Sequence, residues 1–132
     1  NKKTQVIAIR QHGEAWNRPY ISIFEPSLNK NASVQYVEHL TDGQEIIGAK
    51  VVSRVGKTTI TDYIICQDQS NASYINKDIH IEFEGRFGIV RMKESEGKTT
   101  VSLYIGEGKR LCFKANEITT KNQTKAFKSI EL

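Results

Sequence analysis

Alternation of apolar and polar residues with a period of two recurs along this chain and limits what it can fold into. It is clearest over residues 79–84, where Ile79, Ile81 and Phe83 share one side of an extended chain and the intervening residues are polar. Short clusters of Gly, Asn and Asp separate such stretches, whereas helical periodicity is almost absent. This pattern is typical of antiparallel strands with one face in a core. The sequence therefore predicts an all-β fold.

About ten to twelve strands are expected from the spacing of these stretches. They are predicted at residues 6–10, 20–24, 33–40, 45–54, 58–66, 74–75, 79–84, 87–93, 101–105, 111–113, 117–120 and 125–130. Gly85 is expected to end one strand, and residues 106–109 are expected to form a turn. An antiparallel β-sandwich of jelly-roll type fits this spacing, and a closed barrel is the alternative. Residues 1–132 are expected to form a single domain.

Residues 18–26 form a short apolar stretch between Pro19 and Pro26, the only two prolines of the chain. Proline has no backbone donor, so both suit the boundaries of a strand rather than its interior. Bulky side chains occupy both faces, with Tyr20 and Phe24 on one and isoleucines on the other. We expect this stretch to be a strand that is covered on both sides.

The charge is mildly basic, with 19 Lys and Arg against 15 Asp and Glu, a net charge of +4 and a pI near 9.1. This balance favours an anionic partner such as an acidic polysaccharide, and it is too small to indicate nucleic acid. No apolar run approaches the roughly 20 residues of a membrane span. The chain begins at Asn1 without a signal peptide, so it is expected to be a piece of a longer multidomain protein.

Two cysteines, Cys66 and Cys112, stand in apolar surroundings. We expect two buried free thiols, with a disulfide between them as the alternative. The Gly-Lys-Thr segments at residues 56–58 and 97–99 lack the earlier glycine of a phosphate-binding loop and are interpreted as hairpin turns. No nucleotide or other cofactor is predicted.

The three histidines are far apart in the sequence, so no metal site is predicted. His39 and His80 fall on polar faces of their strands and are expected to be exposed. No catalytic residue is assigned, although His12, Glu14 and Tyr20 have the residue types of proton transfer next to a carboxylate.

The best candidates for glycan contact lie just before the proline-bounded stretch. Trp16, Asn17 and Arg18 combine an aromatic face, an amide and a cation, which together suit an acidic sugar. The full set of candidates is Trp16, Asn17, Arg18, Tyr20, His12 and Glu14. For Trp16, a role in capping one end of the core is an equally good interpretation.

Tyrosines supply further aromatic candidates, namely Tyr36, Tyr63, Tyr74 and Tyr104. A half-buried strand position with the hydroxyl group at the rim is the simpler interpretation for them, and above all for Tyr63 and Tyr104.

Several of these stretches resemble a known family. Residues 18–26, then Val34 to His39, Ile46 to Val52 and Thr61 to Ile65, are similar to the C-terminal β-sandwich domain of heparinase II/III-like polysaccharide lyases and related bacterial carbohydrate-active proteins. A later strand that ends in the glycine-rich turn Leu103 to Gly108 adds to the likeness, which spans about His12 to Phe113. In that family the lyase chemistry resides mainly in a helical domain and an adjoining β region, which this chain lacks.

The resemblance implies a non-catalytic accessory domain that packs against the catalytic part of a periplasmic or secreted lyase and contacts glycan. A stand-alone carbohydrate-binding module or lectin is the second hypothesis. An acidic-polysaccharide lyase that uses His12, Glu14 and Tyr20 is the third.

Overall fold

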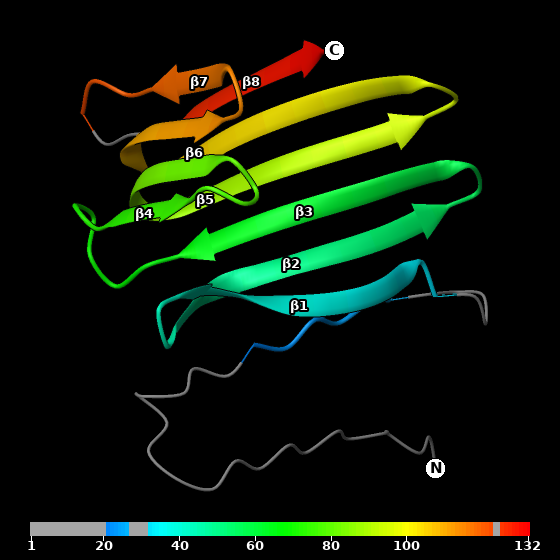
Figure 1. Cartoon of the computed structure of the whole chain (residues 1–132), viewed down its shortest axis with the longest axis horizontal. Helices are drawn as coiled ribbons and strands as arrows, with labels where there is room; N and C mark the ends of the chain where they lie inside the picture. The colour runs from blue at the N-terminus through cyan, green and yellow to red at the C-terminus, as the bar shows by residue number, and fades with distance from the viewer. Residues whose placement is uncertain (1–20, 27–31, 123–124) are drawn as a thin grey trace, which may run out of the picture.

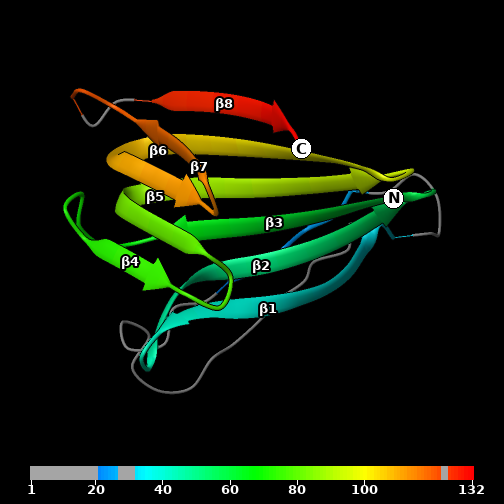
Figure 2. The same cartoon turned by 45° about the horizontal axis from the view of Figure 1, so that its top comes forward.

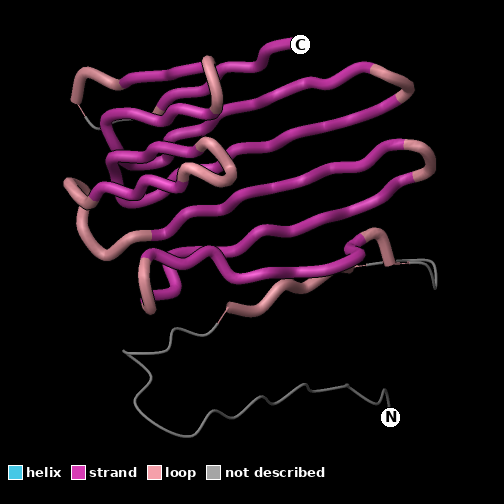
Figure 3. Tube along the Cα trace, viewed as in Figure 1, coloured by secondary structure: helices cyan, strands magenta, loops and turns pink. Residues whose placement is uncertain are grey.

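The computed structural model describes residues 21–26, 32–122 and 125–132. Eight strands and no helix occur in this part of the chain, joined by short turns (Figures 1 and 3). They are β1 (Val34–Asp42), β2 (Glu45–Val55), β3 (Thr58–Cys66), β4 (Ser73–Asn76), β5 (Ile81–Ser95), β6 (Lys98–Phe113), β7 (Asn116–Thr119) and β8 (Ala126–Glu131). Every pairing between them is antiparallel. The predicted all-β antiparallel fold is confirmed.

One sheet contains all eight strands, in the order β1-β2-β3-β5-β6-β7, with β4 also paired to β5 and β8 also paired to β6. The described strands do not close into a barrel, because β1 and β7 stand at the two ends of this order. No helix of the described residues is long and apolar enough to cross a membrane.

The two longest strands, β5 and β6, change neighbours along their length. Residues 81–84 of β5 pair with β4, whereas residues 87–94 pair with β3. Residues 110–113 of β6 pair with β7, whereas residues 100–105 pair with β8. Figures 1 and 2 show both strands curling at one end, so that their curled ends lie with β4 and β7 over the long strands. We call β4, β7 and the curled ends the small layer, and the remaining strands the large layer.

Glycines make this bend. The register between β5 and β6 shifts on either side of Gly85, which pairs with Gly108. A Cβ at Gly85 would lie 2.5 Å from the Gly108 Cα, and one at Gly108 would lie 2.7 Å from the Glu84 carbonyl oxygen. Only residues without side chains allow the two backbones to approach this closely, as at other bulges that turn a strand from one layer to the next.

The core lies between the two layers. The small layer contributes Tyr74, Ile81, Phe83, Leu111, Phe113 and Ile118, and the large layer contributes Leu40, Ile47, Tyr63, Ile65, Val90, Val101, Leu103 and Ile105. The Tyr63 and Phe113 rings meet across the layers with centroids 6.4 Å apart. Each fully buried side chain of this kind stabilises the fold by roughly 1.5–3 kcal/mol. Two packed layers of one antiparallel sheet are consistent with the predicted sandwich.

Several predicted strands are joined in the structure. The predicted end of a strand at Gly85 and the predicted turn at residues 106–109 are both wrong, because they form the bulge inside β5 and β6. The predicted strands at residues 79–84 and 87–93 are therefore joined in the single strand β5, and those at residues 101–105 and 111–113 are joined in β6. The predicted hairpin turns at Gly56 and Gly97 are confirmed, and a third hairpin turn lies at Gly43; all three glycines have a positive φ.

The predicted strand at residues 20–24 is wrong over its described part, since residues 21–26 carry no strand and the Phe24 side chain is 70% exposed. Instead, Glu25 fastens this segment to the start of β1. Its carboxylate accepts hydrogen bonds from the Ser33 amide (2.6 Å), the Ser33 hydroxyl (2.5 Å) and the Val34 amide (3.0 Å). The predicted strand at residues 6–10 lies outside the described residues.

The cysteine prediction is correct about bonding and wrong about burial. Cys66 and Cys112 are both free thiols, but Cys66 is exposed and Cys112 is half-buried. Cys66 is the last residue of β3 and Cys112 points to the outward face of the small layer, beside Glu82 and Glu117 in register. Neither position faces the core.

Candidate functional site

The register of the large layer arranges its outward side chains in rows. Directly paired residues of antiparallel strands point to the same face, so pairing shows which side chains are neighbours. One row comprises Ile64 of β3, Ile89 of β5, Tyr104 of β6 and Phe127 of β8. We call it the aromatic row. The next row along the strands comprises Asp62, Arg91, Ser102 and Ser129 from the same four strands, and we call it the polar row.

The aromatic row is open to solvent at its β8 end. Phe127 is 68% exposed, and Tyr104 is half-buried. The Tyr104 ring meets the Phe87 ring edge to face, with centroids 6.2 Å apart and an interplanar angle of 76°. The Phe87 ring lies against Gly106, where a Cβ would come within 2.5 Å of it. The absence of a side chain at Gly106 lets this ring lie on the sheet and support Tyr104.

An ion pair and a hydroxyl pair make up the polar row. Arg91 donates to Asp62 from Nε (2.7 Å) and from Nη2 (2.9 Å), a two-pronged geometry that fits guanidinium to carboxylate. The hydrogen bond to Asp62 raises the pKa of Arg91, and this effect outweighs the lowering caused by desolvation. The Ser102 and Ser129 hydroxyls lie 3.2 Å apart. The Arg91 side chain is 54% exposed and that of Asp62 only 14%, so the cation dominates the accessible surface of this pair.

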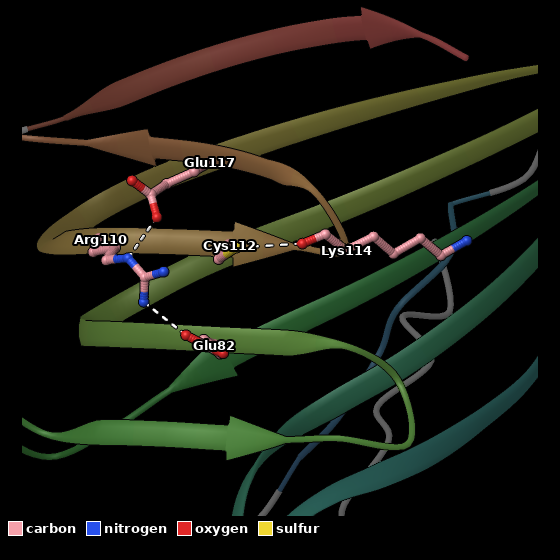
Figure 4. Close-up of polar contacts among 5 residues, drawn as sticks. All are labelled: Glu82, Arg110, Cys112, Lys114 and Glu117. Carbon is pink, nitrogen blue, oxygen red and sulfur yellow. Dashed lines mark hydrogen bonds and ion pairs between the residues drawn. The ribbon is translucent and has the colours of Figure 1, made fainter.

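The outward face of the small layer is organised differently (Figure 4). Arg110 of β6 donates to Glu117 of β7 at 2.6 Å and to Glu82 of β5 at 2.7 Å. Both hydrogen bonds raise the pKa of Arg110, and the bond to Glu82 has the larger effect. Beside it, Lys109 donates to Glu84 at 2.8 Å. These ion pairs join β5, β6 and β7, three of the four strands of the small layer.

A hollow of about 530 Å³ opens on the small layer and is lined by Ile75, Asn76, Lys77, His80, Ile81, Glu82, Cys112 and Lys114. The Cys112 thiol points to the Lys114 carbonyl at 3.5 Å, and Figure 4 shows the Lys114 ammonium directed away from Glu82. A second hollow, of about 320 Å³, has an acidic lining that includes Asp42, Glu45 and Asp68. Among the described residues, no three His, Cys, Asp or Glu side chains are grouped so that they could hold a metal ion.

All six predicted glycan-contact residues, His12, Glu14, Trp16, Asn17, Arg18 and Tyr20, lie outside the described residues. They stay predictions. His39 and His80 are exposed, as predicted.

The tyrosines divide into three groups. Tyr63 and Tyr74 are buried in the core, which removes them as glycan contacts. Tyr36 is exposed, with the Lys50 ammonium 5.5 Å from its ring centroid. Tyr104 is half-buried in the aromatic row. Sequence reasoning missed Phe127 as its partner, although the spacing of Ser102 and Tyr104 matches that of Ser129 and Phe127 on the paired strand.

Together, the fold and these surfaces define a two-layered antiparallel β-domain whose charged and aromatic side chains lie on open faces. A family model described as the endo-acting ulvan lyase C-terminal domain matches residues 34–130. The chain therefore belongs to this family of polysaccharide lyase C-terminal domains.

A relative supports the same assignment. The chain is 50% identical over 127 residues to an endo-acting ulvan lyase of Formosa agariphila, and the match covers 96% of the chain. It spans only 15% of the length of that relative. No solved structure matches the chain. The prediction of a C-terminal domain from a polysaccharide lyase is confirmed at this level.

Proposed function

We propose that this chain is a non-catalytic accessory domain of a polysaccharide lyase, which packs against the catalytic part of the same protein and contacts its polysaccharide. The observation that supports this most directly is the match of residues 34–130 to a lyase C-terminal domain, within a relative about six times longer. The catalytic machinery of the parent protein then lies in the remaining length. A heparinase II/III-like catalytic part and an extracytoplasmic location belong to the same proposal.

The chemistry of the described surfaces supports a non-catalytic role. A lyase needs a base that is free to take a proton and a group that neutralises the neighbouring carboxylate. Arg110 is held between Glu82 and Glu117, and Arg91 pairs with Asp62 and keeps N–H donors that can contact an anion but cannot take a proton. Both stay charged and neither can accept a proton.

Truncation of the parent lyase tests the proposal. We would compare the full-length protein with one that ends before this domain, measuring cleavage of ulvan, cleavage of short soluble ulvan oligosaccharides, and the Tm of the catalytic part. The truncated protein is expected to retain cleavage of short soluble oligosaccharides within about threefold, because uniform binding groups far from the reacting atoms affect KM rather than the chemical step. Its Tm is expected to fall, because contact with the accessory domain is lost.

The competing hypotheses give different results. Cleavage of ulvan by the isolated chain, abolished by His12→Ala, would show an enzyme in its own right. An unchanged Tm of the truncated lyase, together with glycan affinity of the isolated chain, would show a stand-alone binding module.

A further inference from the structure

We infer that the aromatic row and the polar row form a binding platform for an acidic polysaccharide across β5, β6 and β8. This inference rests on the proposed function and names the place on the domain where the polysaccharide binds. Sugar rings would stack on Tyr104 and Phe127, and an anionic substituent, either a carboxylate or a sulfate, would meet Arg91.

The first step is the shape of the surface. Ile89, Tyr104 and Phe127 are directly paired on three adjacent strands, so they cross the sheet in a line roughly 10 Å long. A line of this kind suits an extended chain that runs across the strands. Stacking on sugar rings requires an aromatic face that solvent can reach, and Phe127 at 68% exposure supplies one.

The second step is the hydrogen-bonding capacity of the polar row. Ser102 and Ser129 place two hydroxyl groups one step along the strands from Tyr104 and Phe127. Hydroxyl groups both donate and accept, which matches the hydroxyls of a sugar. A ligand that lies along the aromatic row therefore finds polar partners along one edge, as carbohydrate sites require.

The third step is charge. A guanidinium has five N–H donors. Arg91 directs two of its N–H groups at Asp62, so the others can donate to a ligand. Asp62 is largely covered while Arg91 is exposed, so an approaching ligand meets the cation first. Lys93, exposed on the same face in the following row, adds a second cation. An anionic ligand fits this face better than a neutral one.

The test is retardation of the purified 132-residue chain in native gels that contain ulvan, polygalacturonate, dextran sulfate or neutral dextran. Phe127→Ser and Arg91→Gln are each expected to weaken binding about five- to tenfold, the usual cost of a lost aromatic contact or charged hydrogen bond. Polygalacturonate carries carboxylates and dextran sulfate carries sulfates, so comparison of the two gels shows which anionic group the chain binds.

Matched variants control for composition. Phe24→Ser removes a phenylalanine of nearly equal exposure from another part of the molecule, and Arg54→Gln removes an exposed arginine at the far end of β2. Each is expected to change binding less than twofold. Thermal unfolding of every variant shows that the fold is retained.

Asp62→Asn tests the role of the cation itself. This substitution removes the carboxylate that pairs with the Arg91 guanidinium. Glu96→Gln is the control, because it changes the net charge by the same amount. Binding of the acidic polysaccharides by Asp62→Asn is expected to equal that of Glu96→Gln or to exceed it about two- to threefold. Loss of binding in Asp62→Asn would overturn an anion contact at Arg91.

Other results would overturn the platform. The first is that Phe127→Ser and Arg91→Gln are retarded by the acidic polysaccharides as strongly as the wild-type chain. The second is that neutral dextran retards the wild-type chain as strongly as the acidic polysaccharides do. The third is that no polysaccharide retards the wild-type chain. If the same two variants instead lower the Tm of the full-length lyase, the face is a contact with the catalytic part. The accessory role would survive each of these failures, because truncation of the parent tests it separately.

Discussion

Arg91 and Arg110 occupy comparable positions on the two layers, yet their surroundings give them different roles. Arg110 lies between Glu82 and Glu117 and joins β5, β6 and β7. Arg91 has one carboxylate partner, Asp62, on the neighbouring strand β3. The arginine on the outward face of the small layer is therefore shared by two carboxylates, whereas the arginine on the large layer has one carboxylate and lies near the exposed Phe127 ring. Each guanidinium directs two hydrogen bonds at carboxylates, so the difference between them is one of charge: register gives Arg110 two anionic partners and Arg91 only one.

The bulge that separates the two faces should be the most sensitive point of the molecule. Gly108→Ala is expected to destabilise the fold by about 2–3 kcal/mol, because the added Cβ would lie 2.7 Å from the Glu84 carbonyl oxygen and 2.9 Å from the Gly85 Cα. Urea unfolding followed by circular dichroism measures this change.

Gly43→Ala is the matched control for that substitution. Gly43 has a φ of 60° and no atom within 4 Å of the added Cβ, so only the backbone cost of about 1 kcal/mol is expected. Equal effects of the two substitutions would mean that the close approach at the bulge does not hold the layers in place.

This bulge also marks the limit of what the sequence predicts. Alternation over residues 79–84 identified the core side of β5 correctly, since Ile81 and Phe83 are buried while His80 and Glu82 are exposed. Gly85 and Gly108, however, look like strand ends when each is taken alone. Their role depends on their pairing across strands far apart in the sequence, and no local pattern shows that pairing.

The candidate site was hidden for the same reason. Tyr104 was recognised as a strand tyrosine, but its neighbours Ile89 and Phe127 come from other strands and become visible only through the register. The ion pair of Asp62 and Arg91 joins residues 29 positions apart. The predicted strand at residues 125–130 was placed well, since β8 spans Ala126–Glu131. What the sequence could not supply was which strand it pairs with.

Removal of Arg110 should cost more stability than removal of Arg91. Arg110→Gln is expected to destabilise the fold by about 1 kcal/mol, because two carboxylates lose their shared cation, although the exposure of all three groups keeps the effect modest. Urea unfolding at low and high salt measures it, and 1 M salt should reduce the difference from wild type. An effect no larger than that of Arg91→Gln would show that the second carboxylate adds nothing.

Arg91→Gln should show the opposite balance between stability and binding. A single exposed ion pair contributes about 0.5 kcal/mol or less, so unfolding should change little while retardation by acidic polysaccharides falls. Measuring both quantities for Arg91→Gln and Arg110→Gln gives a direct comparison of the two faces. If Arg110→Gln were the variant that lost binding, the polysaccharide would contact the small layer instead.

The smallest expected effect concerns Glu25, which ties residues 21–26 to the large layer. The Ser33 hydroxyl, and then the Val34 and Ser33 amides, lower the pKa of the Glu25 carboxyl below its ordinary value of 4.5. A lowered pKa in the folded state means that the ionised form stabilises the fold above the unfolded pKa, and that this contribution is lost as the pH falls through the folded pKa. Glu25→Gln should therefore lower the urea midpoint slightly at pH 6 and change it less at pH 3, which lies nearer to the lowered folded pKa of the wild-type carboxyl. Glu45→Gln, which alters an exposed acid at the start of β2, serves as the control. A difference between Glu25→Gln and wild type that is the same at both pH values would show that the carboxylate charge is not what holds this segment against β1.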